Sequence, residues 1–190
     1  PVLRAGRWRP AMAPVVVIAL ALTVIPTAWW ASAFFARNAA VPVITSFDSI
    51  WERAVFLTIN SDRPRVMSAP EGWPAESGRI ARTQTSSRSR LLLKIDPYPD
   101  WSGYDRLSFM VGSANGQEHR VFMSIRDMKS GRSSTYRREI VAHIEPEKIS
   151  IPLADIAAAG VDLEFVREIF VGTADRGGDE QIYFDDFRLE

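Results

Sequence analysis

The feature that most constrains this chain is an uncharged stretch of 22 residues near its N-terminus, from Val15 to Ala36. A helix rises about 1.5 Å per residue, so this stretch is long enough to cross the roughly 30 Å hydrocarbon core of a bilayer. Large aromatic residues gather toward its C-terminal end, where lipid headgroups would meet them: Trp29, Trp30, Phe34 and Phe35. We therefore predict a retained single-pass transmembrane helix over residues 15–36, because the apolar region of a cleaved signal peptide is usually shorter.

The arginines around this stretch predict its orientation. Arg4, Arg7 and Arg9 precede it and only Arg37 follows closely. The positive-inside rule then places residues 1–14 in the cytoplasm and residues 43–190 outside the inner (cytoplasmic) membrane, in the periplasm or the extracellular space. Residues 37–42 are predicted to form a linker. The first residue is Pro1 rather than methionine, which is typical of a processed chain or a part of a longer one.

The composition of the remaining residues excludes several classes of function. After position 37 there are 19 basic and 23 acidic residues, a net charge of −4, which is a poor match for nucleic acid. The chain has no cysteine, so disulfides, thiolate metal sites and cysteine nucleophiles are excluded. His119 and His143 stand alone, without the spacing of a metal or catalytic motif, and no nucleophile-elbow or phosphate-binding motif is present. We predict a protein that is not an enzyme.

After the linker, the pattern is that of strands and turns. Leu107, Phe109 and Val111 alternate with Arg106, Ser108 and Met110, and Val121, Met123 and Ile125 alternate with Arg120, Phe122 and Ser124. This period of two marks strands with one buried face. Further strands are predicted at 43–47, 54–59, 79–85, 91–95, 136–142, 149–151, 166–173 and 181–189, with one short helix at Leu153–Ala159. The fold class is therefore mainly β, an antiparallel jelly-roll-like β-sandwich after one transmembrane helix. The last strand should lie inside a sheet, with Tyr183, Phe187 and Leu189 on one face.

Three segments resemble a known family. Residues 98–127 read YPDWSGYDRLSFMVGSANGQEHRVFMSIRD, an IPLADI segment follows, and the last strand reads IYFDDFRLE. In this order they resemble the carbohydrate-binding-module-like, galactose-binding-like β-sandwich domains, which are also found after the last membrane helix of VanZ-like membrane proteins. The resemblance covers roughly Phe47 to Leu189. It implies the sandwich fold more than any one activity, since such folds carry many functions.

Candidate ligand-binding residues are aromatic. Trp101 and Tyr104 could form a platform on which a sugar ring stacks, or they could pack one end of the core. Trp51 and Trp73 lie in irregular stretches and are candidates for exposed aromatic side chains. The resemblance also implies a structural calcium ion near the first and last strands, for which Asp48, Asp185 and Asp186 are the candidate ligands. Otherwise these aspartates are surface or turn residues, and no other cofactor is expected.

The basic stretch of Lys129, Arg132, Arg137 and Arg138 has two interpretations. It could contact lipid headgroups or an acidic partner, or it could be the solvated face of an edge strand, which charge protects from aggregation. For the whole chain we favour a non-catalytic accessory or structural subunit of a membrane-protein assembly, with the membrane and other subunits as partners. The alternative is a module at the cell envelope that binds a glycan or polysaccharide.

Overall fold

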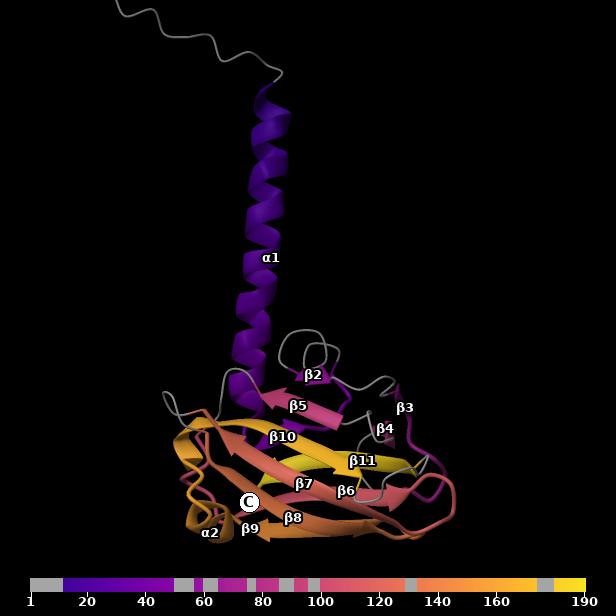
Figure 1. Cartoon of the computed structure of the whole chain (residues 1–190). Helices are drawn as coiled ribbons and strands as arrows, with labels where there is room; N and C mark the ends of the chain where they lie inside the picture. The colour runs from indigo at the N-terminus through magenta and orange to yellow at the C-terminus, as the bar shows by residue number, and fades with distance from the viewer. Residues whose placement is uncertain are drawn as a thin grey trace, which may run out of the picture.

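The computed structural model describes residues 12–49, 57–59, 65–74, 78–85, 91–95, 100–128, 133–173 and 180–190. It shows one long helix standing on a β-sandwich (Figure 1). The elements in chain order are α1 (Met12–Ala40), β1 (Val43–Thr45), β2 (Leu57–Ile59), β3 (Arg65–Ser68), β4 (Arg79–Thr85), β5 (Leu91–Ile95), β6 (Arg106–Ser113), β7 (His119–Asp127), β8 (Thr135–Ala142), β9 (Glu147–Pro152), α2 (Leu153–Ala158), the 3-10 helix η2 (Leu163–Phe165), β10 (Val166–Thr173) and β11 (Glu180–Leu189).

Helix α1 is longer than the predicted transmembrane span. By length and composition it could cross a membrane, and most of its side chains are exposed. It contains Pro26 and continues to Ala40, so the first four residues of the predicted linker, 37–40, are helical. Ala39 and Ala40 have the highest helix propensity of all residues, which explains why the helix continues past its apolar part.

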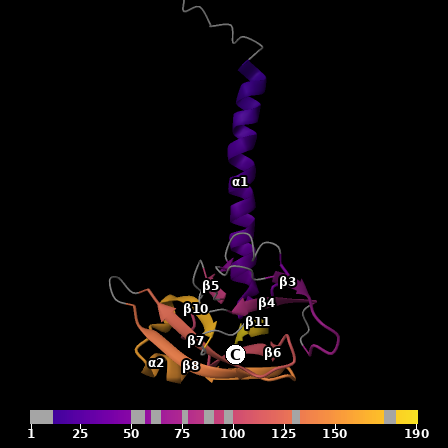
Figure 2. The ribbon, with the colours of Figure 1, turned by 45° about the vertical axis from the view of Figure 1, so that its right-hand side comes forward.

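The strands form two antiparallel sheets. The six-stranded sheet has the order β3-β4-β11-β6-β9, with β1 pairing onto β11 beyond the end of β4. The five-stranded sheet has the order β2-β5-β10-β7-β8. In Figures 1 and 2, β5, β10, β7 and β8 follow one another away from α1, and β3, β4, β11 and β6 do the same in the other sheet. The predicted mainly β sandwich after one long apolar helix is confirmed.

The core lies between the two sheets and follows the predicted alternation. On β7, Val121, Met123 and Ile125 are buried, and on β6 Leu107, Phe109 and Val111 are buried. Phenylalanine rings fill its centre: Phe109 and Phe187 stack with centroids 4.9 Å apart. Burial of this apolar surface is the main stabilising contribution to the fold.

A bulge in β11 changes which residues face the core. Asp185 pairs with Met110 and Arg188 with Ser108, so two residues of β11 lie opposite one residue of β6. Asp186, in the bulge, has a positive φ of 50°, a conformation that aspartate tolerates better than most residues. Ile182 and Phe184 therefore share the core face with Phe187 and Leu189. The prediction that β11 lies inside a sheet is confirmed, but Tyr183 lies on the opposite, outer face.

Other predicted boundaries agree closely with the structure. Strands β4, β5 and β10 have the predicted bounds, and α2 ends one residue earlier than predicted. Gly160, with a φ of 87°, follows the helix, as expected of a residue that ends one. Strand β3 lies in a region where the sequence analysis predicts no strand. Of the predicted strand at 54–59, residues 57–59 form β2, and residues 54–56 lie outside the described residues.

Candidate functional site

The predicted aromatic platform of Trp101 and Tyr104 is part of the core packing. Trp101 is completely buried, and its backbone N–H donates to the carbonyl oxygen of Leu163 (3.0 Å). Tyr104 is half-buried and packs against the core cluster, with its N–H donating to the Trp101 carbonyl (3.1 Å). Trp101 therefore presents no face on which a sugar could stack. Trp51 lies outside the described residues.

Trp73, a candidate for an exposed aromatic side chain, is buried. Its side chain is only 9% exposed and covers the outer face of the six-stranded sheet. Its indole N–H donates to Asp185 Oδ2 (3.1 Å), and its ring meets the ring of Tyr183 edge-on at 5.7 Å. A Cβ atom added to Gly112 would lie 3.0 Å from Trp73 Cζ3, so the indole rests directly on this glycine. Trp73 closes this outer face rather than offering a binding surface.

The three aspartates proposed as calcium ligands have different surroundings. Asp185 is fully buried, and its Oδ1 accepts a hydrogen bond from the backbone N–H of Asp186 (2.7 Å). Asp186 forms an ion pair with Arg188 (2.5 Å), while Asp48 is exposed. Among the described residues, no group of three histidine, cysteine, aspartate or glutamate side chains is placed to hold a metal. The calcium hypothesis, which also involves carbonyl ligands, stays a prediction.

The two histidines have local polar partners. His143 Nδ1 lies 2.6 Å from Glu118 Oε1, and this hydrogen bond raises the pKa of His143, with a smaller contribution from Glu147. His119 is largely buried at the end of β7, where Asn115 Oδ1 lies 2.7 Å from its Nε2. Burial lowers the pKa of His119.

A second aromatic surface lies on the outer face of the five-stranded sheet. Val121 and Met123 of β7 face the core, so Phe122 faces outward. On β10, Ile169 and Val171 face the core and Phe170 faces outward. Both phenylalanines are half-buried. Because Phe170 pairs with Ser124 and Gly172 pairs with Phe122, the two phenylalanines are diagonal neighbours, whose Cα atoms lie about 7–8 Å apart in typical sheet geometry.

Gly172 leaves the space that Phe170 occupies. A Cβ atom added to Gly172 would lie 3.1 Å from Phe170 Cε1, so the ring lies over this glycine, which pairs with Phe122 in the next strand. The guanidinium carbon of Arg137 lies 4.0 Å from the centroid of the Phe122 ring, a cation–π contact. Arg137 also pairs across the strands with Ser124. We call Phe122, Phe170, Ser124, Arg137 and Gly172 the aromatic face.

Charged side chains surround the aromatic face. Arg126 and Glu168 form an ion pair (3.9 Å) on one side, and Arg120 and Glu139 form another (3.7 Å) on the other. Lys94 of β5 pairs with Glu168 in the next strand. The arrangement combines apolar rings, which can cover the C–H faces of a sugar, with donors and acceptors for its hydroxyl groups.

Sequence reasoning missed the aromatic face, although a signal was present. Phe122 and Phe170 each lie between two core-facing residues of a strand, at positions where a polar residue is usual in a sheet with one solvated face. The basic stretch contributes Arg137 to this face. Its strand, β8, is the edge strand of the sheet, as one interpretation predicted. That edge lies on the side of the sandwich away from α1 (Figure 2).

Comparison by sequence found no matching protein-family model and no matching curated protein. Comparison by structure found carbohydrate-binding modules. A family 11 module from Clostridium thermocellum, in complex with a β-1,3-1,4-mixed-linked tetrasaccharide, matches with a TM-score of 0.57 and 15% identity. The match covers 78% of this chain and 94% of the module. The CBM22-1 xylan-binding domain from Paenibacillus barcinonensis matches with a TM-score of 0.51 and 12% identity, over 77% of this chain and 94% of that domain.

An exo-β-agarase also matches, with a TM-score of 0.62 and 12% identity. The match covers 78% of this chain but 25% of the agarase chain. The matches that cover nearly all of the other protein are thus to binding modules, and the match to an enzyme is partial. At these identities the likeness shows the fold: the sandwich is that of carbohydrate-binding modules, as the sequence resemblance implied. The link to VanZ-like membrane proteins stays a prediction.

Proposed function

We propose that this chain is a membrane-anchored, non-catalytic carbohydrate-binding module, and that its ligand lies on the aromatic face. The observation that carries the proposal is the pair of outward phenylalanines, Phe122 and Phe170, on a sheet whose other outward residues are mostly polar or charged. Two modules with this fold are described as being in complex with a β-1,3-1,4-mixed-linked tetrasaccharide and as a xylan-binding domain, which supports a polysaccharide ligand. This is the alternative from the sequence analysis, now preferred to the accessory subunit.

The accessory-subunit hypothesis lacks an observation of comparable weight. Helix α1 exposes most of its apolar side chains, as would both a lipid-embedded anchor and a helix packed against other subunits. The feature therefore does not favour assembly over simple anchoring. The aromatic face, in contrast, supports ligand binding directly.

The ligand-binding part of the proposal is tested with the full chain in mild detergent. Soluble mixed-linkage β-glucan, xylan and agarose oligosaccharides serve as probes, and affinity is measured by calorimetry and by retardation in polysaccharide-containing gels. Phe170→Ala and Phe122→Ala should each weaken binding about tenfold, equivalent to about 1.4 kcal/mol. Phe165→Ala is the matched control, because Phe165 is 41% exposed but does not belong to the aromatic face. Equal affinity of all three variants, or no binding to any probe, would reject the aromatic face as a glycan site.

The anchoring part of the proposal has a separate test. If α1 is retained and oriented by the arginines before it, the full-length chain should stay in membranes after alkaline extraction. Protease added to spheroplasts should then digest the sandwich. Release of a chain shortened within α1 would identify a cleaved signal sequence, and protection of the sandwich would reverse the orientation.

A further inference from the structure

Helix α1 is joined to the sandwich by very few residues. It ends at Ala40, and β1 begins at Val43. The backbone N–H of Leu189 donates to the Pro42 carbonyl (2.9 Å), and β1 pairs with β11 beside it. Ile44, directly after the junction, is buried in the core. Hydrogen bonds and core packing therefore hold the first residues after α1 in place. The junction between the helix and the sandwich, residues 41–44, is short and is packed against the sandwich.

This junction determines which part of the sandwich lies nearest a membrane crossed by α1. In Figures 1 and 2, β3 and β4 of one sheet and β2 and β5 of the other lie at the α1 end of the sandwich. Strands β8 and β9 and helix α2 lie at the opposite end. The apolar stretch ends at Ala36, about one helical turn before the end of α1. The α1 end of the sandwich is therefore placed at the depth of the lipid headgroups.

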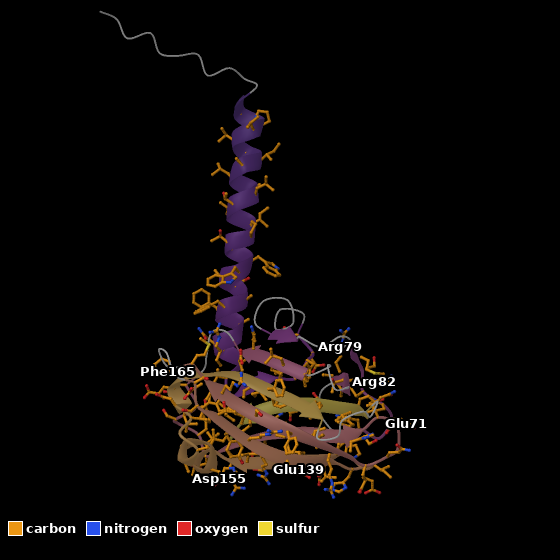
Figure 3. All side chains as sticks on the ribbon, in the orientation of Figure 1. Glu71, Arg79, Arg82, Glu139, Asp155 and Phe165 are labelled. Atoms are coloured by element: carbon orange, nitrogen blue, oxygen red, sulfur yellow. The ribbon has the colours of Figure 1, made fainter. Side chains whose placement is uncertain are left out.

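The two ends of the sandwich differ in charge. Figure 3 places Arg79, Arg82 and Phe165 toward the α1 end, and Glu139 and Asp155 at the far end. The described residues 43–49, 65–74, 78–85 and 91–95, near α1, contain four basic and two acidic residues. Residues 135–159, at the far end, contain three basic and four acidic residues. Among the described residues, the four segments near α1 therefore carry a net charge of +2 and residues 135–159 a net charge of −1, while the segment that holds Phe165 also contains Asp162 and Glu164.

The side chains at the α1 end suit an anionic, interfacial surface. Arg79 is exposed at the start of β4. Arg82, half-buried, is held by a hydrogen bond to Gln181, which fixes the position of its charge. Phe165 is 41% exposed, and Met128 beside it is 52% exposed. The backbone N–H of Met128 donates to the Phe165 carbonyl (3.2 Å). Figure 3 shows Phe165 on one side of this end and the two arginines on the other. Exposed aromatic rings and arginines are both favoured at the interface of a negatively charged bilayer.

We infer that the α1 end of the sandwich, through Arg79, Arg82 and Phe165, rests on the anionic headgroups of the membrane that α1 crosses. This rests on the anchoring part of the proposed function and not on glycan binding. Each basic residue near an anionic surface contributes about 1 kcal/mol, too little to recruit a soluble domain. The anchor, however, makes the contact intramolecular, so weak contacts suffice to hold the sandwich in one orientation. In that orientation both sheets stand upright on the membrane, and the aromatic face points sideways, on the strands farther from the bilayer.

The absence of cysteine from the sequence allows a direct test. The full chain is placed in nanodiscs of phosphatidylcholine, with or without phosphatidylglycerol, after an environment-sensitive fluorophore has been attached to a single cysteine. Phe165→Cys reports on the α1 end, and Asp155→Cys is the control at the far end. Lipids with a headgroup spin label should quench the reporter at position 165 at least twofold more than the reporter at 155, and more strongly when phosphatidylglycerol is present.

Charge reversal separates docking from simple proximity. In the Phe165→Cys background, Arg79→Glu should reduce the quenching in phosphatidylglycerol discs, and Arg79→Gln should reduce it less. Arg138→Glu, which changes an exposed arginine on β8, is the matched control and should leave the quenching unchanged. Near-ultraviolet circular dichroism verifies that each variant is folded. Equal quenching at the two positions, or no effect of Arg79→Glu, in protein that co-elutes with discs would overturn this inference alone. Failure to co-elute would overturn the anchor and this inference with it.

Discussion

Replacing Trp73 by phenylalanine tests whether this residue seals the outer face of the six-stranded sheet. The change removes the indole N–H that donates to Asp185 Oδ2 at 3.1 Å. The side chain of Asp185 is fully buried, and this oxygen loses that hydrogen bond. Loss of a hydrogen bond to a charged group costs about 1.5–3 kcal/mol. The smaller ring also gives up apolar contact over Gly112 and beside Tyr183, which adds about 1 kcal/mol.

The total, about 3 kcal/mol, should lower the Tm of a domain of this size by roughly 6–12 °C. The measurement is thermal unfolding of the full chain in mild detergent, with near-ultraviolet circular dichroism as the signal that monitors unfolding. Trp30→Phe is the matched control, since Trp30 lies on the exposed part of α1 and the same change there should shift the Tm very little. In a double-mutant cycle with Asp185→Asn, the two changes should be strongly non-additive. A Tm within 2 °C of the parent for Trp73→Phe would refute this account of the buried aspartate.

Three further predictions concern pH, packing and calcium. Because the hydrogen bond to Glu118 raises the pKa of His143, Glu118→Gln should return that pKa toward its ordinary value in an NMR titration. The stability that this pair contributes is present at low pH and is lost as the pH rises through the raised pKa of His143. Gly112→Ala should cost about 1–3 kcal/mol in urea unfolding, because its Cβ would lie 3.0 Å from Trp73 and 3.2 Å from Pro146, whereas Gly103→Ala meets nothing within 4 Å and should be neutral. The calcium hypothesis predicts that excess calcium raises the Tm and that Asp48→Asn abolishes the rise; an unchanged Tm of the parent would reject it.

The strands were the most predictable part of the molecule. β4, β5 and β10 carry clear runs of β-forming residues bounded by turn residues, and local pattern alone sets their limits. β3 has four residues, begins with arginine and lies at the edge of its sheet, where charged and polar residues are common. A short polar edge strand therefore has the same composition as a loop, and only its pairing with β4 distinguishes it.

The positions that sequence reasoning misjudged depend on contacts between distant residues. The partner that buries Trp73 is 112 residues away in the chain. The bulge at Asp186 shifts the alternation of β11 by one residue, and the sequence around it contains no glycine to mark the positive φ. A strict period of two then places Tyr183 on the core face, whereas the bulge turns it outward to meet Trp73.

The two outer faces of the sandwich each carry an aromatic pair, and their differences decide which one can bind a ligand. On the six-stranded sheet, Trp73 has its N–H bonded to a buried carboxylate and its ring pressed onto Gly112, so exposing it would break a charged hydrogen bond. On the five-stranded sheet, Phe122 and Phe170 have no polar atoms to satisfy, and the group above Phe122 is the exposed side chain of Arg137. An exposed guanidinium can move at little cost and can itself donate to sugar hydroxyl groups. Uncovering the Phe122 ring should therefore cost less free energy than uncovering Trp73, which supports our proposal that the ligand binds on the five-stranded sheet.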